Sequence, residues 1–338
     1  MKASVLPISL RSERGIEENR KITWLELFFD LVFVAAVAQA GTHLRDDYSP
    51  SGLLRFALLF VMIWWAWVGH TTFSTRFDTD DIVQRGLTAL QLFLVAVMAI
   101  NATGALDSRD SAGFAAAYSV MRLVLAGQFL RARRVRRARA LATRYAAACG
   151  AAAALWLASA FLDAPARFLV WALALTLDVG TPLVTTRQLV DVPHDAAHLP
   201  ERYGLFSIIL IGESMAAVMA GMGHQEYWSL RAASAAILGM ATVFGLWWTY
   251  FDGVDATAHR MVRSMADAKR FQLWSYIHLP LYLGIAVMGV GLERVIETAT
   301  DAPLPSSEAL ILGGAVATIA GSLTIIGITR HSSNRRAI

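Results

Sequence analysis

The chain has 338 residues, of which 56% are hydrophobic and 17% charged, with a mean hydropathy of +0.48. This composition excludes an ordinary soluble protein and indicates an integral membrane protein. The net charge of +4 does not indicate nucleic-acid binding, because the basic residues stand in short clusters between apolar runs. The single cysteine, Cys149, lies in an apolar run. No intrachain disulfide can form, and we expect no cysteine-based metal site. We also predict no other metal and no cofactor.

The amino-terminal tail, residues 1–22, is basic and holds only a brief apolar patch. This patch is too short for a signal peptide, so the tail is predicted to stay uncleaved in the cytosol. The first predicted span, residues 23–41, contains two acids, Glu26 and Asp30, in an otherwise apolar run. Their helical spacing places both on one face, roughly 6 Å apart along the axis. A carboxylate facing lipid is costly, so this face is expected to point into protein or water.

Ten apolar stretches are close to the roughly 20 residues that a helix needs to cross a bilayer. They cover residues 23–41, 52–72, 84–104, 112–131, 141–162, 165–185, 203–222, 230–251, 271–292 and 306–328. The predicted fold class is therefore all-α, a polytopic transmembrane helical bundle over residues 23–328. A short tail at residues 329–338 follows the last span.

Basic residues alternate strongly from loop to loop. With the amino terminus inside, each predicted outer loop carries one arginine, whereas the cytosolic loops and both tails carry several. This positive-inside pattern predicts that both termini are cytosolic. The densest cluster, Arg131 to Arg139, is interpreted as an orientation signal. Binding of anionic lipid head groups or of a protein partner is the alternative.

Several ionisable side chains lie inside the predicted spans. They suggest a polar centre that opens to the cytosol, with Arg122 as counter-ion to Asp30, Glu213 or Asp178. The candidates for binding a ligand or ion are Glu26, Asp30, Arg122, Asp178, Glu213, Ser214 and His278. The candidates for lining a cavity are His70, Trp64, Trp247 and Tyr276.

Each of these residues also has a purely structural interpretation. Arg122 paired with one acid would lock the bundle together, and Asp178, near a helix break, would cap backbone groups. His278 stands just before a proline and would bond a carbonyl that the proline frees. Glu213 is hardest to explain structurally, because a glutamate at membrane depth is costly unless it binds something or carries a proton.

A weak internal repeat relates the two ends of the chain. Leu27-Phe28 in the first span matches Leu205-Phe206 in the seventh, and Trp64-Trp65 in the second matches Trp247-Trp248 in the eighth. An even number of spans separates the copies, so they run in the same direction, as in parallel-repeat transporters. The matches are short, and coincidence is the competing explanation.

Enzyme signatures are sparse. The sequence has no glycine-rich phosphate loop and no His-Glu-x-x-His motif. His194 and His198 stand four residues apart and resemble a metal-binding pair, but Pro193 and Pro200 interrupt the helix around them. We therefore predict no metal there.

Five motifs together carry a family resemblance. They are Trp24-Leu-Glu-Leu-Phe-Phe-Asp30, Arg76-Phe-Asp-Thr-Asp-Asp81, His198-Leu-Pro-Glu-Arg-Tyr-Gly-Leu-Phe206, Ile211-Gly-Glu-Ser214 and Trp247-Trp-Thr-Tyr-Phe-Asp252. Over about residues 20–330 the chain resembles the bacterial low-temperature-requirement A family. The resemblance implies a polytopic protein of the cytoplasmic (inner) membrane, linked by the family name to growth in the cold. It implies no particular substrate or reaction.

Three functional hypotheses follow. The leading one is a transporter or ion-translocating protein that sits in the lipid bilayer and binds a small solute or a proton at the buried carboxylates. The second is a membrane enzyme that acts on a lipid or lipid-linked substrate from the cytosolic face, with Asp30 or His70 as general base. The third, suggested by the arginine cluster, is a non-catalytic membrane scaffold.

Overall fold

The computed structural model describes residues 8–10, 22–78, 81–107, 110–195, 198–225, 229–253, 262, 264–299 and 304–334. This part of the chain forms eleven helices and one pair of short antiparallel strands. The helices are α1 (Trp24–Asp46), α2 (Pro50–Ser74), α3 (Ile82–Ala105), α4 (Ser111–Ala132), α5 (Arg139–Ser159), α6 (Ala166–Val184), α7 (Thr186–Asp191), α8 (His198–Gly223), α9 (Leu230–Gly253), α10 (Met265–Glu297) and α11 (Ser306–Asn334). The strands are β1 (Ser9–Leu10) and β2 (Phe77–Asp78).

Ten of these helices, all except α7, are long and apolar enough to cross a bilayer. The all-helical, ten-span prediction is therefore confirmed within the described residues. Most helix starts lie within two residues of the prediction, but α8 starts at His198 and α10 at Met265, five and six residues earlier than predicted. Most of the amino-terminal tail, the basic residues near Arg260 and residues 335–338 lie outside the described residues.

The chain divides into two compact units. Unit 1 comprises residues 1–36, 62–202 and 259–272, and unit 2 comprises residues 37–61, 203–258 and 273–338, each in its described part. Each unit is described below by itself.

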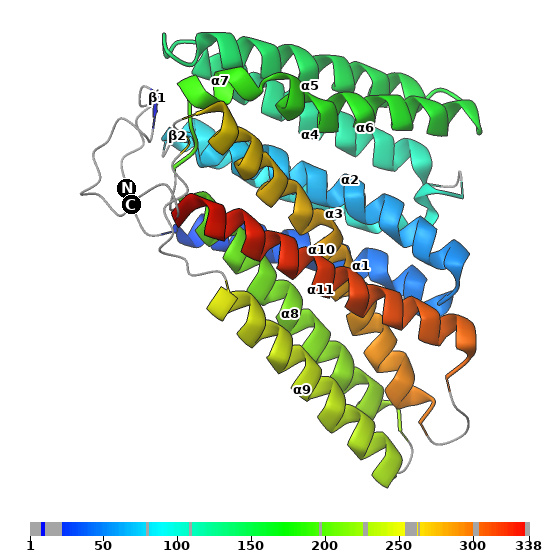
Figure 1. The fold of residues 1–338 in the computed structure, drawn as a ribbon. Helices are drawn as coiled ribbons and strands as arrows, with labels where there is room; N and C mark the ends of the chain where they lie inside the picture. Colours follow the sequence, from blue (N-terminus) through cyan, green and yellow to red (C-terminus); the bar gives the residue numbers. More distant parts are fainter. Residues whose placement is uncertain are drawn as a thin grey trace. The chain divides into compact units, whose positions relative to one another are not determined.

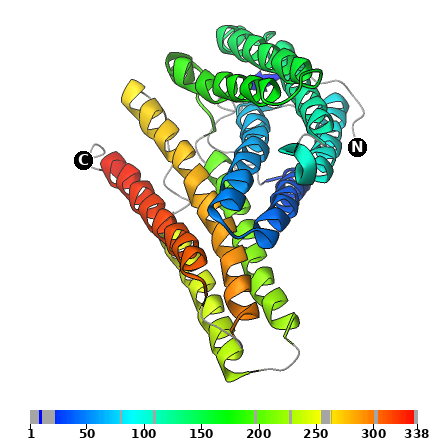
Figure 2. The ribbon, with the colours of Figure 1, turned by 90° about the vertical axis from the view of Figure 1, so that its right-hand side faces the viewer.

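In unit 1, α4, α5 and α6 lie side by side in both views (Figures 1 and 2). Aromatic rings fill the space between them, with Tyr118 against Trp156 at 4.3 Å and Trp156 against Trp171 at 5.0 Å between ring centroids. The small alanine side chains of α5 let α4 approach its backbone closely. Ser119 Oγ of α4 therefore donates a hydrogen bond to the Ala153 carbonyl of α5 at 2.8 Å. Packed apolar faces of this kind hold membrane helices together where the hydrophobic effect between helices is weak.

A second cluster in unit 1 lies where α2 ends in β2. Phe73 and Phe77 meet Phe129 of α4 edge to face, with ring centroids 5.2 and 6.3 Å apart. Leu10 of β1 and Tyr145 of α5 are buried in the same cluster. The strand pair is thus anchored by apolar packing as well as by its backbone hydrogen bonds.

In unit 2, α8 packs closely against α10 and lies beside α9 (Figure 1). A Cβ atom at Gly289 would lie 3.0 Å from Ser214 Oγ and 3.2 Å from Ser214 Cα, so glycine lets the two helices approach closely at this crossing. Ser214 Oγ also lies 3.3 Å from the Ile285 carbonyl, to which it donates. Small residues and a cross-helix hydrogen bond therefore set the spacing between α8 and α10.

Candidate functional site

The first turn of α1 fixes the position of Glu26. The Thr23 backbone N–H and Oγ1 donate to Glu26 Oε2 at 2.9 and 3.0 Å, and the Glu26 N–H donates to Thr23 Oγ1 at 3.2 Å. This reciprocal capping box pairs backbone donors that the start of a helix leaves without partners. The cap holds Oε2, and Oε1 contacts residues of α8.

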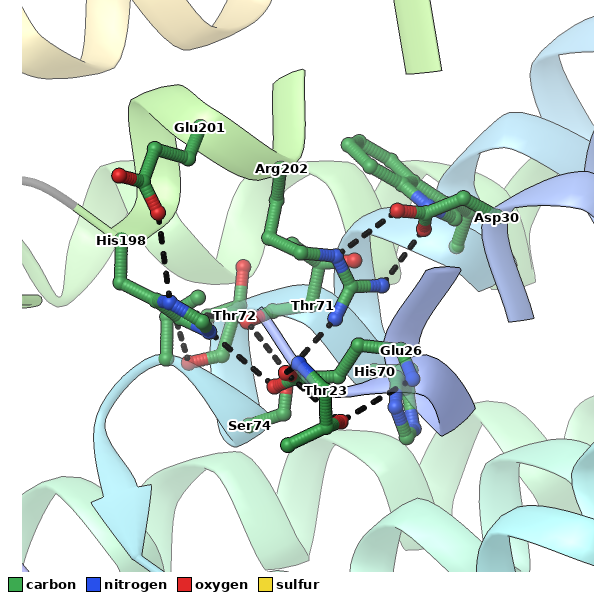
Figure 3. A network of polar contacts seen from close by, with 12 residues as sticks. Thr23, Glu26, Asp30, His70, Thr71, Thr72, Ser74, His198, Glu201 and Arg202 are labelled. Atoms are coloured by element: carbon green, nitrogen blue, oxygen red, sulfur yellow. Dashed lines mark hydrogen bonds and ion pairs between the residues drawn. The ribbon is translucent and has the colours of Figure 1, made fainter. Parts of the chain in front are cut away.

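The first turns of α8 supply the other side of this site. Asp195 Oδ1 accepts a hydrogen bond from the His198 N–H at 3.0 Å and so caps the helix. Glu201 and Arg202 follow His198 by three and four residues, a spacing that places them on one helix face. Figure 3 shows His198 and Arg202 reaching toward the acids of α1.

Arg202 forms a two-pronged ion pair with Asp30 (Figure 3). Its Nε donates to Asp30 Oδ2 at 2.9 Å and its Nη2 to Oδ1 at 2.6 Å. Trp67 Nε1 also donates to Oδ1, at 2.6 Å. Both charged side chains are fully buried. Three short hydrogen bonds therefore offset the desolvation of the Asp30 carboxylate.

His198 stands between a buried and an exposed carboxylate. Its Nε2 lies 3.1 Å from Glu26 Oε1, and its Nδ1 lies 3.9 Å from Glu201 Oε2. The Glu26 side chain is 10% exposed, whereas that of Glu201 is 43% exposed. The two nitrogens of one imidazole thus face a solvent-exposed acid and an acid in the interior, and Nδ1 has no hydrogen-bond partner among the described residues.

Glu26 and Asp30 share one cation of the described part of the chain. Glu26 Oε1 lies 3.6 Å from Arg202 Nη1, and Arg202 Nη2 lies 2.6 Å from Asp30 Oδ1. Charges in an apolar interior are costly without partners, so both carboxylates depend on this guanidinium.

His70 is buried in the same unit. Its ring stacks on Phe29 with centroids 3.8 Å apart, and its Nδ1 lies 2.8 Å from Gln91 Oε1. His70 is thus packed against α1 and hydrogen-bonded to α3, and its predicted role in lining a cavity stays a prediction. It therefore borders the Glu26 and Asp30 cluster from α2 (Figure 3).

The structure pairs Arg122 with Asp178, one of the three partners considered from the sequence. Arg122 Nε lies 3.0 Å from Asp178 Oδ2, and both side chains are buried. Arg122 Nη2 also donates to the Tyr118 hydroxyl at 2.6 Å. A Cβ atom at position 69 would lie 2.8 Å from Arg122 Nη1, so Gly69 makes room for the guanidinium. This second buried pair links α4 to α6.

A third polar pair lies outside the spans. Arg76 Nη2 lies 2.6 Å from His194 Nε2. Arginine can only donate, so this histidine nitrogen must be the acceptor. Burial and the Arg76 guanidinium hold the pKa of His194 well below its ordinary value of 6.5. His194 is therefore neutral at pH 7.

In unit 2, Glu213 lies on an exposed face of α8 and lines a cavity of about 170 Å³. Small side chains of α1, α8 and α10 form most of the wall, and Ser214 and Arg45 add polar groups. Ser214 Oγ donates to backbone carbonyls of Leu210 and Ile285 at 3.3 Å each. The cavity places a carboxylate next to a space large enough for a small solute.

His278 is enclosed by aromatic rings in unit 2. Its Nδ1 lies 2.7 Å from the Trp274 carbonyl, one turn back on α10, and its Nε2 lies 3.3 Å from the Tyr250 hydroxyl. The carbonyl bonded is therefore not the one that Pro280 frees, which belongs to Tyr276. Of the other cavity-lining candidates, Trp64 is fully buried, Tyr276 half-buried and Trp247 exposed.

The structure brings Glu26 and Asp30 together in unit 1, and it places Glu213, Ser214 and His278 in unit 2. Sequence reasoning missed Trp67, His198, Glu201 and Arg202 as members of the first cluster. A usable signal was the His198-x-x-Glu-Arg202 spacing, which gives one helix face an imidazole and a guanidinium.

Comparisons with known proteins give the family of this chain. The family model of the bacterial low temperature requirement A protein matches residues 21–338. The chain is also 28% identical over 323 residues to an uncharacterized protein of Rhizobium meliloti (strain 1021), an alignment that covers 90% of this chain and 77% of that protein. No solved structure matches the chain.

Proposed function

We propose a proton-translocating function for this chain on the premise that it belongs to the bacterial low temperature requirement A family, as its match over residues 21–338 shows. Ten apolar helices make it a multi-pass integral membrane protein. We further propose that it lies in the cytoplasmic membrane with tails 1–22 and 329–338 in the cytosol, because the arginine-rich loops fall on that side.

One observation carries the proposal: His198 connects an exposed acid to a buried one. An imidazole can accept a proton at one nitrogen and release another from the second. In the proposed path, the cytosolic entry begins when Glu201 collects a proton from cytosolic water and passes it to His198 Nδ1. His198 Nε2 then delivers a proton to Glu26 Oε1, which lies 3.1 Å away. The distance of 3.9 Å on the Glu201 side is closed by one water or a turn of the exposed side chain.

The shared arginine supports proton exchange at this site. Among the described residues, Glu26 and Asp30 are both within reach of Arg202, and two close carboxylates favour a proton between or beside them. Asp30 is held by three hydrogen bonds, so we assign it the role of a fixed counter-ion to Arg202. Glu26 Oε1 faces His198 Nε2, so we assign Glu26 as the group that exchanges the proton with His198.

Other polar groups have supporting roles in this proposal. Glu213 and Ser214 line the cavity in unit 2 and are candidates for binding a co-transported small solute. The arginines of the 131–139 cluster are exposed except Arg131, which is half-buried. Arg131 forms an ion pair with Asp81 at 2.7 Å. Their contact with anionic head groups would fix the protein's orientation in the bilayer.

The enzyme hypothesis is less well supported. Asp30 is fully buried and already accepts three hydrogen bonds, and His70 is buried between Phe29 and Gln91. A general base must reach the proton that it removes from a substrate. Neither residue presents a free atom to the cytosolic surface.

The test is proton flux into proteoliposomes that contain a pH-sensitive dye, driven by a potassium diffusion potential. The wild-type protein is expected to conduct protons above empty liposomes. His198→Gln is expected to reduce the flux about 100-fold, because the relay loses its acid–base group. Glu26→Gln should reduce it similarly. Glu308→Gln is the matched control, since it neutralises the partner of Arg294 in unit 2 and should conduct as the wild type does.

Wild-type flux that His198→Gln and Glu26→Gln retain would refute the relay. Absence of any wild-type flux, over a range of pH and with a screen of small solutes, would refute translocation itself. In that case an altered lipid composition in cells that lack the gene, grown in the cold, would favour the enzyme hypothesis.

A further inference from the structure

Three potential metal ligands meet at the ends of two helices in unit 2. His224 follows the last residue of α8, and Glu293 and Glu297 lie one turn apart at the end of α10. One ligand atom from each residue lies within 4.8 Å of the other two. This cluster is in a different part of the chain from the Glu26 and His198 site, and the inference does not depend on the proton relay.

The fold builds this cluster through close helix packing. A Cβ atom at Gly221 would lie 2.9 Å from the Glu293 carbonyl oxygen and 3.1 Å from Ile296 Cβ, so only glycine permits this approach of α8 to α10. Gln225 Nε2 then donates to the carbonyls of Ile296 and Glu297 at 2.9 and 3.1 Å. These contacts hold the segment that carries His224 against the end of α10.

Glu293 supplies the observation that points to a cation. Its side chain is 1% exposed, and its Oε1 has no hydrogen-bond partner among the described residues. Arg45 Nε binds the other oxygen, Oε2, at 3.0 Å. A buried carboxylate oxygen without a partner is costly, so a bound cation at Oε1 would remove an existing penalty.

The remaining ligands are adjustable. His224 Nδ1 lies 2.6 Å from Glu297 Oε1, and the two side chains are 59% and 24% exposed. They can therefore rotate to bring their ligand atoms to the distances of about 2.0 to 2.2 Å that zinc requires. Glu293 and Glu297 bring two carboxyl groups to one place, which favours a bound cation.

We propose that His224, Glu293 and Glu297 form a binding site for a first-row divalent transition metal of the Zn²⁺ type. One imidazole nitrogen with two carboxylate oxygens suits Zn²⁺ better than Mg²⁺, which prefers oxygen ligands and retains its water. Three protein ligands leave one position of a tetrahedral site for water. If the arginine-rich loops are cytosolic, the site lies at the outer surface of the membrane.

The test is a titration of the purified full-length protein in detergent, with Zn²⁺ as the only added metal and binding measured by calorimetry. One Zn²⁺ ion per chain is expected. His224→Ala and Glu297→Gln should each weaken binding about 10-fold or more, because each removes a ligand. Glu308→Gln is the matched control, since it removes a nearby carboxylate outside the cluster and should bind as the wild type does. Mg²⁺ at the same concentrations should not compete.

A second readout uses Co²⁺ in place of Zn²⁺. The wild-type protein should show the visible absorption of a four-coordinate site, and Zn²⁺ should abolish it. Zn²⁺ binding that is unchanged in both His224→Ala and Glu297→Gln would overturn the proposal, as would a wild-type protein without a Co²⁺ spectrum. The two substituted side chains are partly exposed, and far-ultraviolet circular dichroism confirms that each variant is folded before titration.

Discussion

Arg202 illustrates how much one side chain contributes in an apolar interior. Its guanidinium is planar and presents donors in a fixed fork, which matches both oxygens of Asp30. A lysine carries all of its donors on one nitrogen atom. It could not present two separate nitrogens to Asp30 and a third to Glu26. The same guanidinium is the only positive charge that the structure places between Glu26 and Asp30 among the described residues. The protonation state of the site therefore depends on this residue.

The pair of Arg76 and His194 leads to a prediction about pH. The pKa of His194 is held well below 6.5 in the folded protein by burial and by Arg76, whereas in the unfolded chain it returns to about 6.5. Below pH 6.5 the unfolded state therefore binds more protons, and stability falls as the pH decreases. One such group contributes up to about 1.4 kcal/mol per pH unit.

His194→Gln is the matched variant, because a glutamine oxygen can accept from Arg76 but does not titrate. Thermal unfolding of purified protein at pH 7.5 and pH 5.5 measures the difference. The wild type is expected to lose more stability on acidification than His194→Gln does. Equal losses in both proteins would contradict the assignment of a depressed pKa to His194.

At the residue scale, the sequence predicted one half of the candidate site. Glu26 and Asp30 were placed on one face of a helix and expected to avoid lipid, and the structure buries both. Their partner Arg202 is 172 positions from Asp30, a separation over which spacing rules carry no information. Pro200 was taken to break the helix, although proline is tolerated in a first turn, where its missing N–H would have no partner. The predicted span, residues 203–222, therefore left His198 and Arg202 outside the helix.

At the scale of elements, glycine determines how closely helices approach. Gly221 on α8 faces the backbone of α10, where a methyl group would meet the Glu293 carbonyl oxygen at 2.9 Å. Gly212 on the same helix has no atom within 4 Å of the position that its Cβ would take. The two glycines thus differ in packing, although both lie in one apolar helix.

Alanine substitutions at these two positions should have opposite effects. Gly221→Ala is expected to destabilise the protein by about 1 to 3 kcal/mol, because the backbone of α10 must shift. Gly212→Ala should be neutral or stabilise by up to about 1 kcal/mol, since alanine favours the helix. Denaturant or thermal unfolding in detergent measures both, and a similar loss in the two variants would show that the crossing of α8 and α10 is not tight. Gly221→Ala should also weaken Zn²⁺ binding.

The spans were the most predictable elements. Hydropathy locates a membrane helix because every backbone polar group in lipid must be paired within it. Hydropathy does not detect polar turns that extend a helix beyond the bilayer. The first turns of α10 contain Asp267, Lys269 and Arg270, and the apolar part of the helix follows them. The predicted start at residue 271 was therefore late. The internal repeat stays a prediction, since the short motif matches do not establish it.

At the scale of the whole molecule, the distribution of arginine predicts which surface faces the cytosol. The loop between α4 and α5 contains the densest cluster, and Arg136 in it is exposed. The loop between α5 and α6 contains Asp163, which is also exposed. These two loops flank the same helix and must lie on opposite sides of the membrane if α5 crosses it.

Cysteine labelling tests this orientation directly. The chain has one cysteine, Cys149, and it is buried, so a Cys149→Ser background removes the only native thiol. In intact cells, a membrane-impermeant maleimide is expected to label Asp163→Cys, whereas Arg136→Cys should react only after permeabilisation. The reverse pattern would invert the topology, and with it the cytosolic entry assigned to the proton relay.

The fork between Arg202 and Asp30 also constrains how such a sequence can diverge. Loss of either charge alone leaves the other buried without its partner, which destabilises the folded protein by about 3 to 5 kcal/mol. Exchange of both residues for well-packed apolar ones can leave the stability nearly unchanged. A lineage could cross from the charged to the uncharged state only through an unstable intermediate. Descendants should therefore keep both residues or lose both, and a homologue with one alone would need a new partner nearby.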